Sequence, residues 1–117
     1  MTEQEKIEKE LRSMIIDFEK AYGAILNQGR RNIENVRRRQ IFFHLTYLKY
    51  KGRLSLKRIA EIVFETAAAG TKKKPFDHST LVYCTQVCND MEYLGFYEDY
   101  IENRDSINKI INHEGKN

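Results

Sequence analysis

The sequence is poor in several features that identify common protein classes. It has two cysteines, one proline and no tryptophan. Two cysteines four residues apart, Cys84 and Cys88, provide neither a disulfide framework nor a complete set of zinc ligands. No apolar stretch approaches the roughly 18 to 20 residues that a membrane span needs. Glycine-rich phosphate-binding motifs are also missing, which argues against nucleotide hydrolysis and dinucleotide chemistry.

Catalytic and metal-binding patterns are equally sparse. No pair of carboxylates and no nucleophile–base spacing rises above chance, so we expect no enzymatic activity and no cofactor. Cys84 and Cys88 could join His44 or His78 in a metal site. Cysteines four apart on an apolar helical face are more often packing residues, so we expect no metal. The polar, acidic N-terminus carries no secretory signal, which predicts a cytoplasmic protein.

The residues that are present indicate one helical domain. The chain has 117 residues, of which 41% are hydrophobic and 32% are charged. Apolar residues recur at helical spacing between glycines and capping residues. This pattern predicts an all-α fold, a compact bundle of about five helices. We expect these helices over about residues 3–26, 36–51, 56–63, 78–93 and 97–111. A stop at 27–29 and a polar connection at 32–35 separate the first two. Ser55 and Asp77 are the expected N-caps of the third and fourth helices, and Gly95 ends the fourth.

We divide the chain into three regions. Residues 1–30 form an N-terminal amphipathic helix, residues 31–112 form the main domain, and residues 113–117 form a tail that is expected to fray. The first helix could pack in the core, form a homodimer, or dock a protein partner through its apolar face.

Charge is distributed unevenly along the chain. Residues 23–75 carry thirteen basic and three acidic groups, a net charge of +10, whereas residues 1–22 carry −2 and residues 76–117 carry −5. A basic block of this size between acidic flanks predicts a polyanionic partner. The alternative is a solvated basic face without a partner.

The third and fourth helices form a candidate helix-turn-helix with an elongated joint. Some thirteen residues, Phe64 to Phe76, lie between them, whereas three or four are usual for this motif. Gly70 and Pro75 break the helical pattern there, so we expect a basic loop over Gly70 to Phe76. The first residues of this segment could instead prolong the third helix.

Three segments in a fixed order carry a family resemblance. They are Val36-Arg-Arg-Arg-Gln40, Leu54-Ser-Leu-Lys-Arg-Ile-Ala-Glu-Ile62 and Asp77-His-Ser-Thr-Leu81. Together they resemble the C-terminal DNA-binding domain of the bacterial replication initiator DnaA, over about residues 35 to 111. The chain differs from that family in its longer joint, in Ala60 at the position of a family glycine, and in Gln86 and Val87 at the position of a basic pair. It has no ATPase domain and so looks like a stand-alone relative.

The resemblance implies a DNA-binding site. The helix that Asp77 opens would enter the major groove N-terminus first, with His78, Ser79, Thr80 and the outward-facing Tyr83 near the bases. Arg39 aligns with a family arginine that reaches into the minor groove, and Arg37 and Arg38 would add phosphate contacts. The start of the third helix would touch the DNA backbone, and the joint could follow the duplex. The residues in these two places are Ser55, Lys57, Arg58, Lys72, Lys73 and Lys74.

Simpler interpretations remain open for some of these residues. Asp77 could accept a hydrogen bond from a cytosine amino group or merely cap its helix, and His78 could be an ordinary exposed histidine. The lysines of the joint could be solvated.

The leading functional hypothesis is sequence-specific binding of double-stranded DNA in replication or transcription, at the nucleoid and without catalysis. The alternative is a protein–protein interaction module that retains the fold, and RNA binding is a weaker third possibility.

Overall fold

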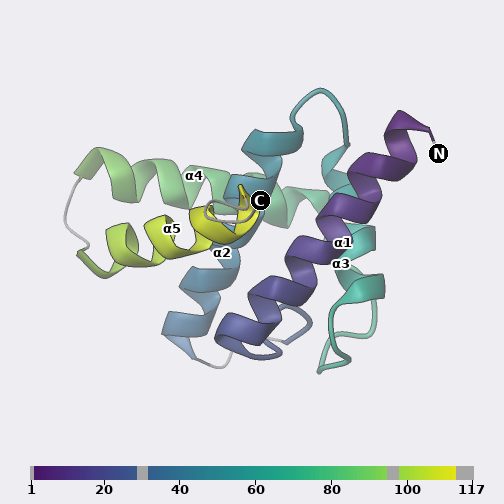
Figure 1. Cartoon of the computed structure of the whole chain (residues 1–117). Helices are drawn as coiled ribbons and strands as arrows, with labels where there is room; N and C mark the ends of the chain where they lie inside the picture. Colours follow the sequence, from purple (N-terminus) through teal and green to yellow (C-terminus); the bar gives the residue numbers. More distant parts are fainter. Residues whose placement is uncertain (1, 29–31, 95–97, 113–117) are drawn as a thin grey trace.

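The computed structural model describes residues 2–28, 32–94 and 98–112. This part of the chain contains five α-helices and no strands, which confirms the predicted all-α bundle (Figure 1). The helices are α1 (Glu3–Tyr22), α2 (Ile33–Tyr50), α3 (Leu56–Thr66), α4 (His78–Leu94) and α5 (Glu98–Ile111). No helix in these ranges is both long enough and apolar enough to cross a membrane.

The first helix begins as predicted but ends earlier. Thr2 and Glu5 form a capping box, with each side chain accepting a hydrogen bond from the other residue's backbone. The helix ends at Gly23, whose φ of 88° favours glycine, rather than at 27–29. The prediction was wrong because the apolar spacing continues through Leu26. Ile25 and Leu26 instead pack into the core from a turn after α1 (residues 23–28).

The start of α2 was also misplaced. The side chain of Asn32 accepts hydrogen bonds from the backbone N–H groups of Glu34 and Asn35, so the helix starts at Ile33 instead of about residue 36. A polar connection over 32–35 was the wrong prediction because these residues form the cap and first turn. The three consecutive arginines therefore lie one turn inside α2.

The expected caps of α3 and α4 are present. The hydroxyl of Ser55 accepts from the backbone N–H of Arg58, and the carboxylate of Asp77 accepts from the backbone N–H of Ser79 at 2.9 Å. The end of α3 at Thr66 confirms that the first residues of the joint prolong this helix. The expected stop at Gly95, the expected start of the last helix at Tyr97 and the tail at 113–117 lie outside the described residues.

One hydrophobic core unites the five helices. The apolar face of α1 is buried in this core together with residues of every other helix. The buried residues of α1 are Ile7, Leu11, Met14, Ile15 and Phe18. This face is therefore used within the chain, which removes it as the surface for a homodimer or a protein partner. Not every apolar residue of these helices is in the core: Leu48 and Ile101 are 53% and 42% exposed, whereas Phe43 and Tyr100 are buried.

Helix α2 occupies the centre of the arrangement. It packs against α3, α4 and α5, while α1 packs against α3 and α5. Figure 1 shows α4 and α5 at one end, where Glu92 of α4 accepts hydrogen bonds from Tyr100 and Arg104 of α5, and α1 beside α3 at the other end. The joint, which the structure confines to residues 67–77, connects these two ends.

An ion pair between Glu8 and Arg58 connects α1 to α3. Arg58 Nη2 and Nε donate to the two carboxylate oxygens of Glu8, at 2.7 and 3.0 Å. Such two-point pairs are among the stronger charged interactions. The hydrogen bond from Arg58, followed by one from Gln4, lowers the pKa of Glu8 from 4.5 to about 2.

We expect Glu8→Gln to lower the free energy of unfolding by about 1–2 kcal/mol at neutral pH, because Arg58 then loses its ionised acceptor. The folded-state pKa of Glu8 lies below its ordinary value of 4.5, so this stabilisation is present above pH 4.5 and is lost as the pH falls toward about 2. Urea unfolding of both proteins across this pH range measures it. The exposed Glu102→Gln is the control. A difference that persists at the lowest pH would contradict the assignment.

Candidate nucleic-acid interface

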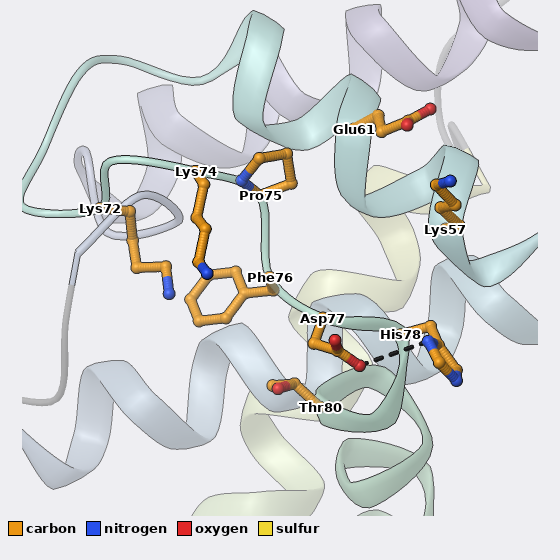
Figure 2. Close-up of a pocket in the computed structure, with 9 residues that line it drawn as sticks. All are labelled: Lys57, Glu61, Lys72, Lys74, Pro75, Phe76, Asp77, His78 and Thr80. Carbon is orange, nitrogen blue, oxygen red and sulfur yellow. Dashed lines mark ion pairs between the residues drawn. The ribbon is translucent and has the colours of Figure 1, made fainter.

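An open groove of about 730 Å³ lies where α3, the joint and α4 meet. Figure 2 shows its walls: α3 on one side, the joint on the other, and the first turn of α4 below. Six of the predicted DNA-binding residues line it, together with Glu61, Pro75 and Phe76. These six are Lys57, Lys72, Lys74, Asp77, His78 and Thr80. Residues far apart in the sequence are thus brought together at one surface.

The first turn of α4 is fixed by Asp77. Its carboxylate accepts from the backbone and from the hydroxyl of Ser79, at 2.9 and 2.8 Å, and lies 3.3 Å from His78 Nδ1. The backbone hydrogen bond from Ser79 is the main cause of a lowered pKa for Asp77. The capping role of Asp77 is therefore confirmed. Because the side chain remains exposed, the cap does not prevent it from contacting a ligand.

One face of α4 is exposed, including Tyr83, which was predicted to face outward. Ser79, Tyr83, Gln86 and Asp90 all face solvent, and Tyr83 is 52% exposed. The opposite face is buried through Leu81, Cys84 and Cys88. The exposed face is therefore free of intramolecular packing over several turns.

The joint is ordered by contacts with α1 and with the turn after α1. The carboxylate of Glu19 accepts from the backbone N–H of Ala68 at 3.0 Å. The backbone N–H of Lys72 donates to the carbonyl oxygen of Asn27 at 2.9 Å. Further along, the ammonium of Lys72 lies 4.3 Å from the centre of the Phe76 ring, while Lys73 and Lys74 are exposed.

The structure does not support a minor-groove role for Arg39. This side chain is 8% exposed, and its Nη1 donates to the carbonyl oxygens of Ile25 and Gln28, at 3.1 and 3.0 Å. Its guanidinium also lies 5.3 Å from the centre of the Phe76 ring. The prediction was wrong because Arg39 lies on the buried side of α2, one turn from the buried Val36 and Phe43. Its hydrogen bonds join α2 to the turn after α1.

Two other predicted phosphate contacts are engaged within the protein. Arg58 is held by Glu8, and its Nη1 also lies 3.4 Å from Glu61 Oε1. Arg38 pairs with Glu34 at 2.6 Å and lies 5.0 Å from the centre of the Tyr22 ring. Neighbouring carboxylates therefore neutralise both arginines within the protein, and neither arginine lines the groove. Arg37 is half-buried on α2, and Ser55 is an exposed cap outside the groove lining.

Sequence reasoning missed three residues of this region. The ring of Phe76 has the cations of both Lys72 and Arg39 near its centre, and it packs edge-on against Phe43 at 5.6 Å. Glu61 places a carboxylate in the groove wall, and Asn27 contacts the joint. An aromatic residue directly after Lys-Lys-Lys-Pro in a basic loop is the one sequence signal that could have identified Phe76.

The cysteines pack in the core. Burial raises the pKa of Cys84 to about 11 and that of Cys88 to about 12, so both are thiols at neutral pH. Within the residues that the structure describes, no three His, Cys, Asp or Glu side chains gather as metal ligands would.

Comparison of the chain with protein-family models, with curated proteins and with solved structures finds no match. The groove and the exposed face of α4 are therefore the observations from which function is inferred.

We expect Arg39→Leu to lower the free energy of unfolding by about 1–3 kcal/mol, because the carbonyls of Ile25 and Gln28 lose a charged donor. Urea unfolding at neutral pH measures this loss. Lys57→Leu, at an exposed position, is the control and should change stability by less than about 0.5 kcal/mol. Equal effects of the two substitutions would show that Arg39 has no special structural role.

Proposed function

We propose that the protein binds double-stranded DNA sequence-specifically, with α3, the joint and α4 acting as a helix-turn-helix. The single observation that carries the proposal is the groove, in which three lysines border the first turn of α4. The resemblance to the C-terminal domain of DnaA supports the same helix as the recognition helix. The protein would then be a stand-alone relative of that domain, acting at the nucleoid in replication or transcription.

The proposed docking places α4 in the major groove. The major groove of B-DNA is wide enough for one helix. The exposed face of α4 is the face that would enter this DNA groove. Ser79 and Thr80 offer hydroxyls that donate or accept, and His78 offers an imidazole. Tyr83 follows one turn later on the same face. Asp77 can accept from a cytosine amino group while it continues to cap the helix.

The lysines around α4 would contact the DNA phosphates on either side of the major groove. Lys57 is at the start of α3, where the first helix of such a motif crosses the DNA backbone. Lys72 and Lys74 line the opposite wall, formed by the joint, and Lys73 is exposed between them. Because Arg38, Arg39 and Arg58 are engaged within the protein, these four lysines form the proposed phosphate-binding set.

The carboxylates in the groove limit where phosphates can lie. Glu61 and Asp77 line the same space as the lysines, and a phosphate close to either would be repelled. Phosphates are therefore expected at the rims near the lysine ammonium groups, with base edges near Asp77. This mixture of charges favours one register of the duplex over non-specific adsorption.

Selection of bound sequences from a pool of random duplexes tests the proposal directly. Enrichment of a defined sequence is the expected result. Recovery of an unenriched pool would overturn sequence-specific binding. Competition with duplex RNA provides a second arm, because the narrow major groove of A-form RNA does not admit a helix. Preferential capture of the RNA would favour the third hypothesis instead.

We expect the affinity for the selected duplex to depend on salt. If the four lysines neutralise about four phosphates, the slope of log affinity against log salt concentration should be roughly −3.6. Replacing Lys57, Lys72 and Lys74 by alanine together should bring the slope to roughly −0.9. Fluorescence anisotropy of a labelled duplex measures both slopes.

The matched control removes the same charge elsewhere. Lys6, Lys9 and Lys20 are exposed on α1 and do not line the groove, so their joint replacement by alanine should leave the slope almost unchanged. An equal change of slope in both triple variants would mean that only net charge matters.

We expect substitutions in the first turn of α4 to alter sequence preference. His78→Ala and Thr80→Ala should each reduce the discrimination between the selected duplex and single-base variants by about 1–3 kcal/mol at one position of the site. Gln86→Ala, two turns further along the exposed face, is the comparison. If His78→Ala and Thr80→Ala weaken binding equally on every sequence, these residues do not contact bases.

A further inference from the structure

The turn after α1 contains a buried amide at the end of α3. Asn27 is 3% exposed, and its Nδ2 lies 3.2 Å from the carbonyl oxygen of Phe64 and 3.3 Å from those of Ala67 and Ala68. Carbonyls at the C-terminal end of a helix have no partners within that helix. Asn27 therefore supplies the donor for α3 and for the first residues of the joint from a distant part of the sequence.

The main chain of Asn27 holds the next part of the joint. Its carbonyl oxygen accepts from the backbone N–H of Lys72. Gly70 lies so close that a β-carbon there would overlap this carbonyl oxygen and approach Gln28 Nε2 at 2.8 Å. Only a residue without a side chain fits between the two backbones. Asn27 and Gly70 thus form a docking contact between the turn and the joint.

This contact fixes the lysines of the groove. The backbone N–H of Lys72 donates a hydrogen bond to the carbonyl oxygen of Asn27. The side chain of Lys72 lies over the ring of Phe76, the residue that precedes Asp77 and α4. Lys74 lies two residues further and lines the same wall. We infer that Asn27 is a positioning residue of the proposed DNA site: it docks the joint on the turn after α1 and thereby sets where Lys72 and Lys74 lie relative to α4.

The physical reason is the cost of ordering a long connection. A free joint over residues 67–77 would sample many conformations, and binding would have to select the one that presents both ammonium groups. A docked joint presents them before DNA arrives. This inference rests on the proposed function, because the advantage exists only if the lysines contact phosphates.

Two substitutions disrupt the contact from opposite sides. Asn27→Ala removes the donor, and Gly70→Ala introduces the overlap with the Asn27 carbonyl. Neither residue lines the groove. Each variant should bind the selected duplex about tenfold more weakly, because the joint must be ordered on binding. In either variant, the further change of Lys72 and Lys74 to alanine should lower the affinity for the duplex less than twofold. The same two changes in the wild-type protein should lower the affinity much more.

A general loss of stability would not produce this pattern. Ile107→Val, a mild core substitution in α5 away from the groove, is the control, and it should keep both the affinity and the full response to the lysine substitutions. Hydrogen exchange at the Lys72 amide gives a readout independent of DNA. It should become at least about tenfold faster in Asn27→Ala and Gly70→Ala than in Ile107→Val, because the acceptor is displaced.

The outcomes separate the inference from the function on which it rests. If the wild type binds DNA and the two variants keep both its affinity and its response to the lysine substitutions, the positioning role is wrong and the proposed function stands. If the wild type binds no duplex, the proposed function is wrong and the DNA role of Asn27 falls with it. Fast exchange at Lys72 in the variants would then still establish the docking contact.

Discussion

The buried guanidinium of Arg39 joins three parts of the chain that are distant in sequence. It projects from α2, donates to two carbonyl oxygens of the turn after α1, and lies against the Phe76 ring just before α4. Burying a charge is unfavourable unless hydrogen bonds replace its hydration. The turn must therefore keep its carbonyls aimed at Arg39. The same turn supplies Asn27 to the joint, so the geometry of the proposed DNA site depends on this one side chain.

The basic block separates into two chemical roles once the structure is known. Arg38, Arg39 and Arg58 are neutralised or hydrogen-bonded within the protein, and a planar guanidinium suits such multipoint contacts. The lysines at the groove have flexible stems and exposed or half-exposed ammonium groups. Around the candidate site, these three arginines make contacts within the fold, whereas Lys57, Lys73 and Lys74 provide exposed positive charge. The net charge of a sequence segment does not distinguish cations that are paired within the fold from cations that are exposed.

The sequence predicted the elements of the fold better than the roles of its charges. Capping residues at Ser55 and Asp77 placed two helix starts, because a cap depends on neighbours only two or three residues away. The end of α1 was missed because apolar spacing continued past Gly23 while the backbone left the helix. The burial of Arg39 depends on carbonyls of a different segment. Local patterns cannot reveal such a contact.

The difference between local patterns and contacts between distant segments also explains which parts of the candidate site the sequence predicted. The exposed face of α4 follows from helical spacing alone, and Lys57, Lys72 and Lys74 were identified as basic residues near it. Asn27 looked like a helix stop, and only the fold shows that its amide lies against the end of α3. The long joint appeared to weaken the comparison with a helix-turn-helix. Docked on the turn after α1, it instead adds a lysine-bearing wall beside α4, so an insertion between the two helices can extend the proposed interface without loosening it.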